Sequence, residues 1–227
     1  MSFERSTDPV EGLLYAAVRL NSPPIVSLKT FLRWLDDSHI PDLCNAKDGI
    51  AVALRYKNTH PAADAEGGKA TTKVPYPLLA IYKLRDIHWL TGEGFLSCGH
   101  ESELFPAEVG HNVFGCCEVQ LRSYALVARS VGGPGADKPK YVVTFEIPEA
   151  DSNEFGAIDK ANSAMSGYRG AILYTVAQGL LEYGQRDVPK KGLVFAWFDG
   201  MPAIDGTKYD AQVWELEHHD GKQGAEF

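Results

Sequence analysis

A histidine with carboxylates on both sides is the first candidate for chemistry in this sequence. His39 lies in the stretch WLDDSHIPDL, with Asp36 three residues before it and Asp42 three residues after it. A nearby carboxylate stabilises an imidazolium ion and orients one ring nitrogen, so such a histidine can act as a general acid or base near neutral pH. Helix geometry puts Asp36 about one turn before His39, which predicts the two as a catalytic pair. The alternative is that a His-Ile-Pro turn only seats a helix end against a sheet.

A tyrosine further along the chain could complete this chemistry. Tyr82 belongs to the run LLAIYKL, in which alternation places it on the same strand face as Leu78 and Ala80. If that face meets the helices, we expect the Tyr82 hydroxyl to donate a hydrogen bond to a developing enolate. If the face lies on the opposite side of the sheet, Tyr82 is a packing residue.

Several other side chains are candidates for substrate binding. Phe31 and Trp34 share the helix face that must meet a sheet, which makes them core candidates as well. Tyr56 poses the same choice of orientation as Tyr82, and the short helix after residue 86 could line a pocket mouth or face solvent. The predicted substrate-binding residues are Phe31, Trp34, Asp42, Tyr56, His88 and Trp89.

The helix that must carry His39 has a defined start and an expected end. Ser27 is a candidate N-cap, and apolar residues then recur on one face at Leu28, Phe31, Leu32 and Leu35. Pro41 disfavours helical geometry at the residue before it, so we predict that the helix ends near Ser38 or His39. Carboxylates at a helix C-terminus oppose the macrodipole. We interpret this loss of helix stability as tolerated for the function of His39.

The rest of the chain predicts one order of elements twice. Strands are expected at 12–20, 48–57, 78–84 and 117–129, with a surface loop at 58–75 and a short helix at 86–94. After a Gly- and Pro-rich linker at 132–139, strands are expected at 140–148, 168–178, 192–198 and 212–218, with helices at 154–164 and 205–210. Asp151 and Glu154 could cap the first of these helices reciprocally. We therefore predict an internal duplication with domains 1–131 and 140–227.

Composition excludes several classes of partner. The 227 residues carry a net charge of -8, and no stretch gathers enough Lys and Arg for a nucleic-acid groove. No segment has the length of a membrane helix, and the N-terminus does not read as a secretory signal. Neither the four cysteines nor the histidines have metal-site spacing, and no Gly-rich phosphate loop occurs. We expect a cytoplasmic protein without cofactor or metal.

Each predicted half is an α+β unit with one antiparallel sheet and helices on one face. Because the other face of each sheet must also be buried, we predict that two such sheets pack face to face within the single chain. The sequence leaves open whether this fused pair forms a homodimer.

Several motifs resemble those of a known family. They are Leu13-Leu-Tyr in the first strand, FLRWLDDSHIPDL, the strand end Arg55-Tyr56, PLLAIYKL, and the run of Arg122, Tyr124 and Leu126. Together they resemble the dimeric α/β-barrel superfamily, more narrowly its EthD-like branch and the duplicated members found in fungi. The resemblance spans residues 12–218. It implies tandem ferredoxin-like repeats that form an intramolecular barrel, with a pocket between sheet and helices and the histidine of HIPD as a recurrent catalytic candidate.

Three departures from the family pattern affect what the resemblance implies. Leu35 stands where the pattern usually has Tyr, so a hydroxyl is missing there. The second half lacks a histidine after its helix, and residues 58–75 are longer than a minimal loop. We therefore expect one intact pocket in the first half and a degenerate, structural second half.

The resemblance and the residues together suggest a cofactor-independent acid-base enzyme. It would be a lyase, cyclase or isomerase that dehydrates, decarboxylates or closes a ring in a hydrophobic polyketide- or terpenoid-like molecule of secondary metabolism, and positioning would supply much of the acceleration. Two alternatives stay open. One is a cofactorless monooxygenase of a phenolic substrate, and the other is a non-catalytic binding protein. Haem is bound by relatives of this fold, but the sequence singles out no axial ligand.

Overall fold

The computed structural model describes residues 8–21, 23–59, 76–130, 138–177, 182–183, 192–204 and 211–221. The strands are β1 (Gly12–Leu20), β2 (Val52–Asn58), β3 (Leu78–Leu84), β4 (Cys117–Arg129), β5 (Tyr141–Ile147), β6 (Tyr168–Val176), β7 (Glu182–Tyr183), β8 (Gly192–Phe198) and β9 (Gln212–Gly221). The predicted short helix at 205–210 and most of the predicted loop 58–75 and linker 132–139 lie outside the described residues.

Eight of these strands close into one antiparallel barrel. The strand order is β1-β3-β2-β9-β5-β8-β6-β4, and β4 pairs back to β1. The N-terminal strands therefore run β4-β1-β3-β2 and the C-terminal strands run β9-β5-β8-β6. The two sets are joined by hydrogen bonds between β2 and β9 and between β4 and β6. The barrel expected from the resemblance is thus present, and the two predicted sheets are its opposite walls.

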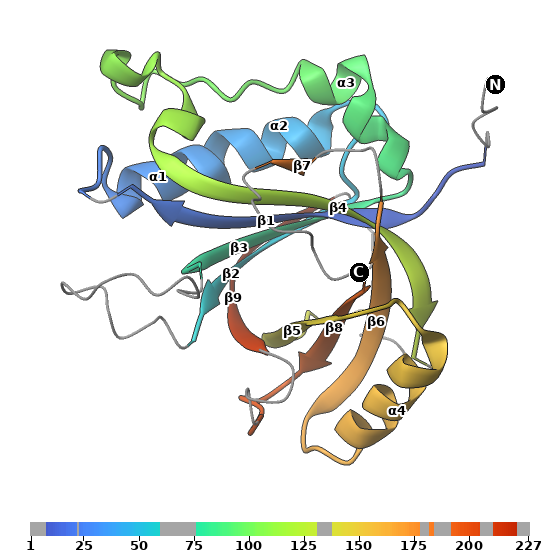
Figure 1. The fold of residues 1–227 in the computed structure, drawn as a ribbon. Helices are drawn as coiled ribbons and strands as arrows, with labels where there is room; N and C mark the ends of the chain where they lie inside the picture. The colour runs from blue at the N-terminus through green and yellow to red at the C-terminus, as the bar shows by residue number, and fades with distance from the viewer. Residues whose placement is uncertain are drawn as a thin grey trace.

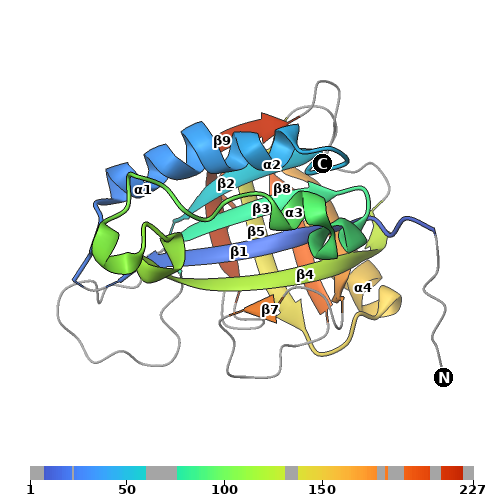
Figure 2. The ribbon, with the colours of Figure 1, turned by 90° about the horizontal axis from the view of Figure 1, so that it is seen from above.

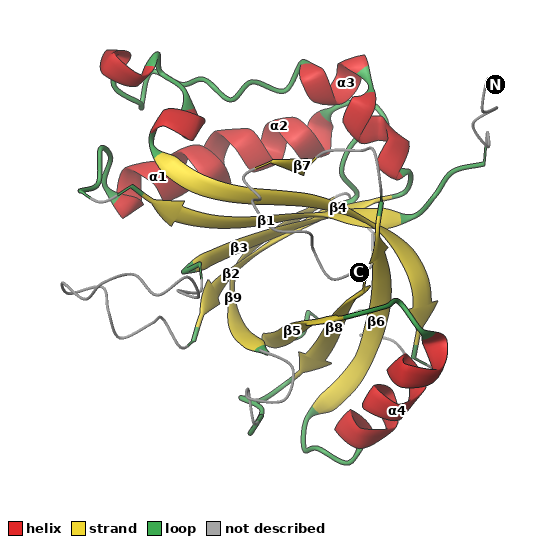
Figure 3. Cartoon of the chain, viewed as in Figure 1, coloured by secondary structure: helices red, strands yellow, loops and turns green. Residues whose placement is uncertain are grey.

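The helices cover the outside of the barrel. α1 (Leu28–Trp34), the π-helical segment η1 (Leu35–His39) and α2 (Ile40–Asn45) lie over the N-terminal strands. The 3₁₀ segment η2 (Ile87–Thr91) and α3 (Glu93–Leu96) lie beside them, whereas α4 (Ser152–Ser163) covers the opposite side (Figure 1). The 3₁₀ turns η3 (Ala107–Val109) and η4 (Val113–Gly115) lie in the segment before β4. Figure 3 shows the same arrangement by element type.

The barrel interior is filled by side chains. On β1, Leu13 and Tyr15 point inward, whereas Leu14, Ala16 and Val18 pack toward the helices. Both strand faces are apolar because both are buried. An eight-stranded barrel has an interior just wide enough for side chains to fill, and here the fully buried interior residues include Tyr56, Tyr124, Tyr174, Phe195, Trp197 and Trp214. The filled interior leaves the layer between the barrel and the helices as the place for a ligand site.

Two local predictions differ from the structure. The helix predicted to end at Ser38 or His39 continues through Pro41 to Asn45, and Figure 2 shows α1 and α2 in one line above the strands. The expected reciprocal cap at α4 is one-sided, since Asp151 accepts from the backbone of Asn153 and Glu154 while its own N–H donates to the carbonyl of Glu149.

The start of β1 requires a glycine for close approach to β4. A Cβ atom at Gly12 would lie 2.0 Å from the backbone oxygen of Tyr124 and 2.5 Å from Cγ2 of Ile87. Because one of these atoms belongs to the backbone, the strand itself would have to move. By contrast, a Cβ at Gly156 on the exposed side of α4 meets nothing within 4 Å.

Substitution of the two glycines should therefore have opposite effects. We expect Gly12→Ala to lower the free energy of unfolding by about 1–3 kcal/mol through overpacking. Gly156→Ala should raise it by roughly 0.5–1 kcal/mol, since alanine has the higher helix propensity. Urea denaturation of both variants measures the difference. Equal effects of both substitutions would contradict the close contact of β1 with β4.

Candidate functional site

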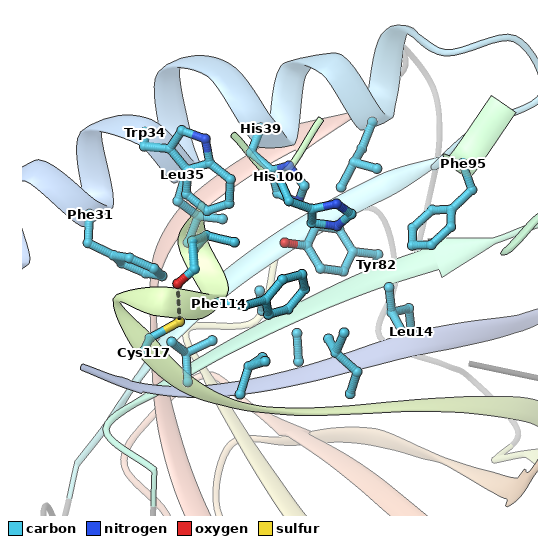
Figure 4. Close-up of a pocket in the computed structure, with 17 residues that line it drawn as sticks. Leu14, Phe31, Trp34, Leu35, His39, Tyr82, Phe95, His100, Phe114 and Cys117 are labelled. Carbon is cyan, nitrogen blue, oxygen red and sulfur yellow. Dashed lines mark hydrogen bonds between the residues drawn. The ribbon is translucent and has the colours of Figure 1, made fainter. Parts of the chain in front are cut away.

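A small cavity lies between the first helix and the outer face of the N-terminal strands. Its volume is about 60 Å³. Figure 4 shows its walls, formed by the helix residues above, the strands below and the segment before β4 at the side. The lining residues are Leu14, Ala16, Val18, Phe31, Trp34, Leu35, His39, Leu43, Ala80, Tyr82, Phe95, His100, Val113, Phe114, Cys117, Val119 and Leu121. Among these described residues there is no Asp, Glu, Lys or Arg, so the cavity is apolar and uncharged.

The π-helical turn Leu35–His39 brings His39 to this cavity. Its characteristic hydrogen bond runs from the N–H of Ile40 to the carbonyl of Leu35, five residues earlier. In a turn of this width residues five apart lie one above the other, whereas in an α-helix they point in different directions. The imidazole of His39 accordingly stacks on the indole of Trp34, with ring centroids 4.5 Å apart and an interplanar angle of 18°.

The wide turn also explains why Pro41 does not end the helix. In a regular α-helix its ring would clash with the carbonyl four residues earlier and no N–H could donate to it. The π-turn lies immediately before Pro41, and the following α2 begins with Pro41 in its first turn, where a missing N–H is tolerated. Asp37 and Ser38, on the outside of the turn, are exposed, so solvent can reach the freed carbonyls. Asp36 and Asp37 are thus inside the continuous helix and not at its C-terminus.

His39 is a buried and neutral imidazole. Only 9% of the residue is exposed, and burial together with the nearby ring of His100 lowers its pKa to about 4. A hydrogen bond to the backbone of Gly99 acts in the opposite direction. Nδ1 has no hydrogen-bond partner among the described residues, so the nitrogen that bonds to Gly99 is Nε2. A bond that raises the pKa is one in which the ring donates. Nδ1 therefore presents an unpaired acceptor lone pair.

The expected partnership of His39 with Asp36 is wrong. The carboxylate of Asp36 accepts hydrogen bonds from Nε and Nη2 of Arg55 at 2.9 and 2.8 Å. With both oxygens bound by Arg55, Asp36 points to β2 and not to the imidazole. The predicted stabilisation of an imidazolium by this carboxylate is absent, which agrees with a lowered rather than a raised pKa of His39.

Tyr82 and His100 complete the polar groups of the cavity. Tyr82 lies on the strand face that meets the helices, and burial raises the pKa of its hydroxyl, so it stays protonated. The His100 ring lies 5.6 Å from that of His39 and 5.1 Å from that of Phe114. Burial lowers the pKa of His100 as well. Figure 4 shows the three polar side chains converging between helix and sheet.

The predicted substrate-binding residues divide into two groups. Phe31 and Trp34 line the cavity, with ring centroids 5.8 Å apart. The other four lie elsewhere: Tyr56 is inside the barrel, Asp42 is exposed on α2, His88 bonds to Asp86 at 2.8 Å, and Trp89 donates to the carbonyl of Lys47. The structure does not bring these four residues to the cavity, because alternation and helix phase direct their side chains to other faces.

Sequence reasoning missed the wall formed by the segment between α3 and β4. This segment contributes His100, Val113 and Phe114, and β4 itself contributes Cys117. Residues 97–116 form short turns without helical or strand periodicity, so no pattern pointed to them. The alternating apolar residues Leu14, Ala16 and Val18 of β1 were predictable as one strand face.

No three or more His, Cys, Asp or Glu side chains in the described ranges are grouped so that they could hold a metal ion. All four cysteines are free and buried. None of the helices among the described residues is both long and apolar enough to cross a membrane.

Comparison with known proteins supports the fold. A solved structure from Fusobacterium nucleatum subsp. nucleatum, described as a "Putative monooxygenase", is similar with a TM-score of 0.52 and 8% identity, covering 94% of this chain and 95% of that chain. No family model matches the sequence, and no curated protein matches it. At this identity the likeness concerns the fold alone.

The lowered pKa of His39 has a consequence for stability in acid. Between its unfolded pKa of 6.5 and its folded pKa of about 4, the unfolded chain binds the proton more strongly. The contribution of this group to the free energy of unfolding should therefore fall by about 3 kcal/mol as the pH drops from 7 to 4. Urea denaturation across this range should show a smaller loss for His39→Phe, which keeps the stacked ring but does not titrate. An identical pH dependence of both proteins would contradict a buried neutral imidazole.

Proposed function

We propose that the cavity binds a small, mainly apolar molecule whose hydroxyl or other donor group meets Nδ1 of His39. The observation that supports this proposal is the unpaired acceptor in an otherwise apolar enclosure. A buried acceptor without a partner costs about 1–3 kcal/mol, and a ligand that donates a hydrogen bond would remove this cost. A phenol or an enol combines such a donor with an apolar body.

The chemistry that we propose at this site is proton transfer without a cofactor. A neutral imidazole is the basic form of histidine, and His39 keeps this form at neutral pH because its pKa lies at about 4. The same low pKa makes it a weaker base than an ordinary histidine, so the transfer depends on stabilisation of the anion that forms. It would accept a proton from the substrate, while the protonated hydroxyl of Tyr82 would donate to the oxygen that gains negative charge. Asp36 is bound to Arg55 and is not available to the imidazolium, so the substrate anion would stabilise the charged ring. Dehydration, decarboxylation, ring closure and isomerisation all include such a step.

The size of the cavity limits the substrate class. At about 60 Å³ it is smaller than the roughly 150 Å³ that admits benzene. A polyketide- or terpenoid-like molecule would therefore enter only if side chains such as His100 and Phe114 move outward. Both lie on the segment between α3 and β4, which makes this segment the proposed entrance.

The family assignment is part of the same proposal. We place the chain with the duplicated members of the EthD-like branch, with tandem ferredoxin-like repeats at 1–131 and 140–227. The matching strand orders β4-β1-β3-β2 and β9-β5-β8-β6 support this duplication. The short HIPD stretch with its π-turn supports the placement of the site in the first repeat.

Binding of phenol and toluene tests the role of Nδ1. The two molecules have nearly the same shape, so opening the cavity costs the same for both and their affinity ratio isolates the hydroxyl. We expect the protein to prefer phenol by about tenfold, the equivalent of one hydrogen bond of roughly 1.4 kcal/mol. Calorimetric titration measures both dissociation constants.

A matched pair of histidine variants completes this test. His39→Phe should abolish the preference for phenol, whereas His88→Phe, which changes a histidine outside the cavity, should keep it. Equal binding of phenol and toluene by the unchanged protein would contradict the proposed ligand chemistry.

Oxygen-dependent chemistry on an electron-rich phenol is the second candidate. It is favoured by the printed name of the structural neighbour and by the unpaired Nδ1 of His39, which can accept a hydrogen bond from a phenol. The two candidates differ in their use of dioxygen, because proton transfer proceeds in its absence.

Deuterium exchange separates the two candidates. We expect the protein to accelerate exchange of the α-protons of cyclohexanone in D₂O by at least about tenfold, a modest share of the range for general-base catalysis. The rate, followed by NMR, should be equal under air and nitrogen and lost in His39→Phe. Protein-dependent oxygen uptake with hydroquinone, without any acceleration of exchange, would favour the monooxygenase instead.

A further inference from the structure

An ion cluster lies between the π-turn and the barrel. Arg55 on β2 donates to both oxygens of Asp36 through Nε and Nη2, and to Glu217 of β9 through Nη1. The Arg55 side chain is only 6% exposed. Such a fork of hydrogen bonds fixes the relative orientation of guanidinium and carboxylate as well as their distance. Asp36 is thereby fixed relative to the sheet.

A β-bulge directs a second strand at the same cluster. Arg55 lies opposite His218, but Tyr56 lies opposite Leu216, so Glu217 is an extra residue in β9. Bulges of this kind re-aim side chains that would otherwise alternate between the two faces. As a result both Glu217 and His218 reach the helix side, where Nδ1 of His218 is 3.9 Å from Asp36.

Stability alone is a weak reason for such a cluster. A buried ion pair often contributes little net stability, because desolvation offsets its attraction. A π-turn, in turn, is rare and is kept only where its surroundings determine it. The bidentate contact reaches Asp36, which lies in the same five-residue turn as His39. The two irregularities, one in the helix and one in β9, therefore meet at Arg55.

We infer that Arg55 is a positioning residue for His39, acting through its grip on Asp36 and supported by Glu217 from the C-terminal strands. The contact holds the turn wide, and the wide turn keeps the imidazole stacked on Trp34 with Nδ1 at the cavity. The carboxylate next to the histidine thus serves its geometry and not its charge. This inference rests on the proposed function only for its effect on ligand selectivity.

The test uses variants in which charge and position act in opposite directions. Removing the negative charge of Asp36 or Glu217 by Asp36→Asn or Glu217→Gln lowers the pKa of His39 through space. Loosening the turn lets the ring leave its buried stack, which raises that pKa. We expect a net rise of about one unit or more, measured by NMR titration of the full chain.

Two further readouts accompany this titration. The ring-current shift that Trp34 imposes on the His39 protons should decrease, and the phenol-over-toluene ratio should fall by about tenfold. Arg55→Lys keeps the positive charge but loses the forked pair of hydrogen bonds. This variant should retain only part of the ring-current shift and of the phenol-over-toluene ratio of the unchanged protein. The matched control is Arg122→Gln, which breaks the similarly buried pair of Arg122 with Glu146 on the barrel interior. This control should lower stability and leave all three readouts unchanged.

The outcomes separate positioning from mere support. If Asp36→Asn and Glu217→Gln destabilise the protein as Arg122→Gln does but leave the pKa of His39 unchanged or lower, the inference is overturned. If Asp36→Asn does not fold, Glu217→Gln carries the same test of sign. If the unchanged protein does not prefer phenol over toluene, the proposed function fails. The pKa of His39 and its ring-current shift, both measured without ligand, still decide the inference.

Discussion

One hydrogen bond, from the N–H of Ile40 to the carbonyl of Leu35, determines how the first helix relates to the rest of the molecule. Because this bond spans five residues, the following turn is rotated relative to an α-helix. The rotation places His39 over Trp34, lets the helix pass Pro41, and directs Asp36 to the sheet. A regular helix would preserve the same apolar stripe but would not bring these three features together.

His39 is buried, and none of the described residues that line its cavity is an Asp, Glu, Lys or Arg. Both features favour the uncharged ring. Where an acidic residue faces an imidazole, the pair favours the charged ring. Here the acidic residue is taken up by Arg55, and the ring is left in an apolar layer with His100, Tyr82 and Phe114. The result is an imidazole that stays uncharged over the physiological range. Under the proposed function, the substrate would have to supply the counter-ion when this ring accepts a proton. Such a site discriminates by hydrogen bonding and shape more than by long-range electrostatics.

The sequence predicted the elements better than the contacts. The bounds of β1, β3, β4 and β8 agree with the predicted ranges, because their apolar runs end at turn residues. The helix end was wrong because Ile40, the residue before Pro41, keeps α-helical backbone angles of φ -62° and ψ -49°, which the following proline disfavours but does not forbid. The partner of Asp36 was wrong because Arg55 lies nineteen residues away, and no local pattern encodes that contact. His100 was missed because its segment has no periodicity.

The described residues of the C-terminal strands do not line the cavity. These strands nevertheless have a role in the closed ring. In the ring, β2 and β4 each have neighbours on both sides, supplied in part by β9 and β6. Residues 1–131 by themselves would present both strands as bare edges, ready to add strands from other molecules. The C-terminal strands thus act as an internal partner that protects the first half from aggregation, and they can do so without performing any chemistry of their own.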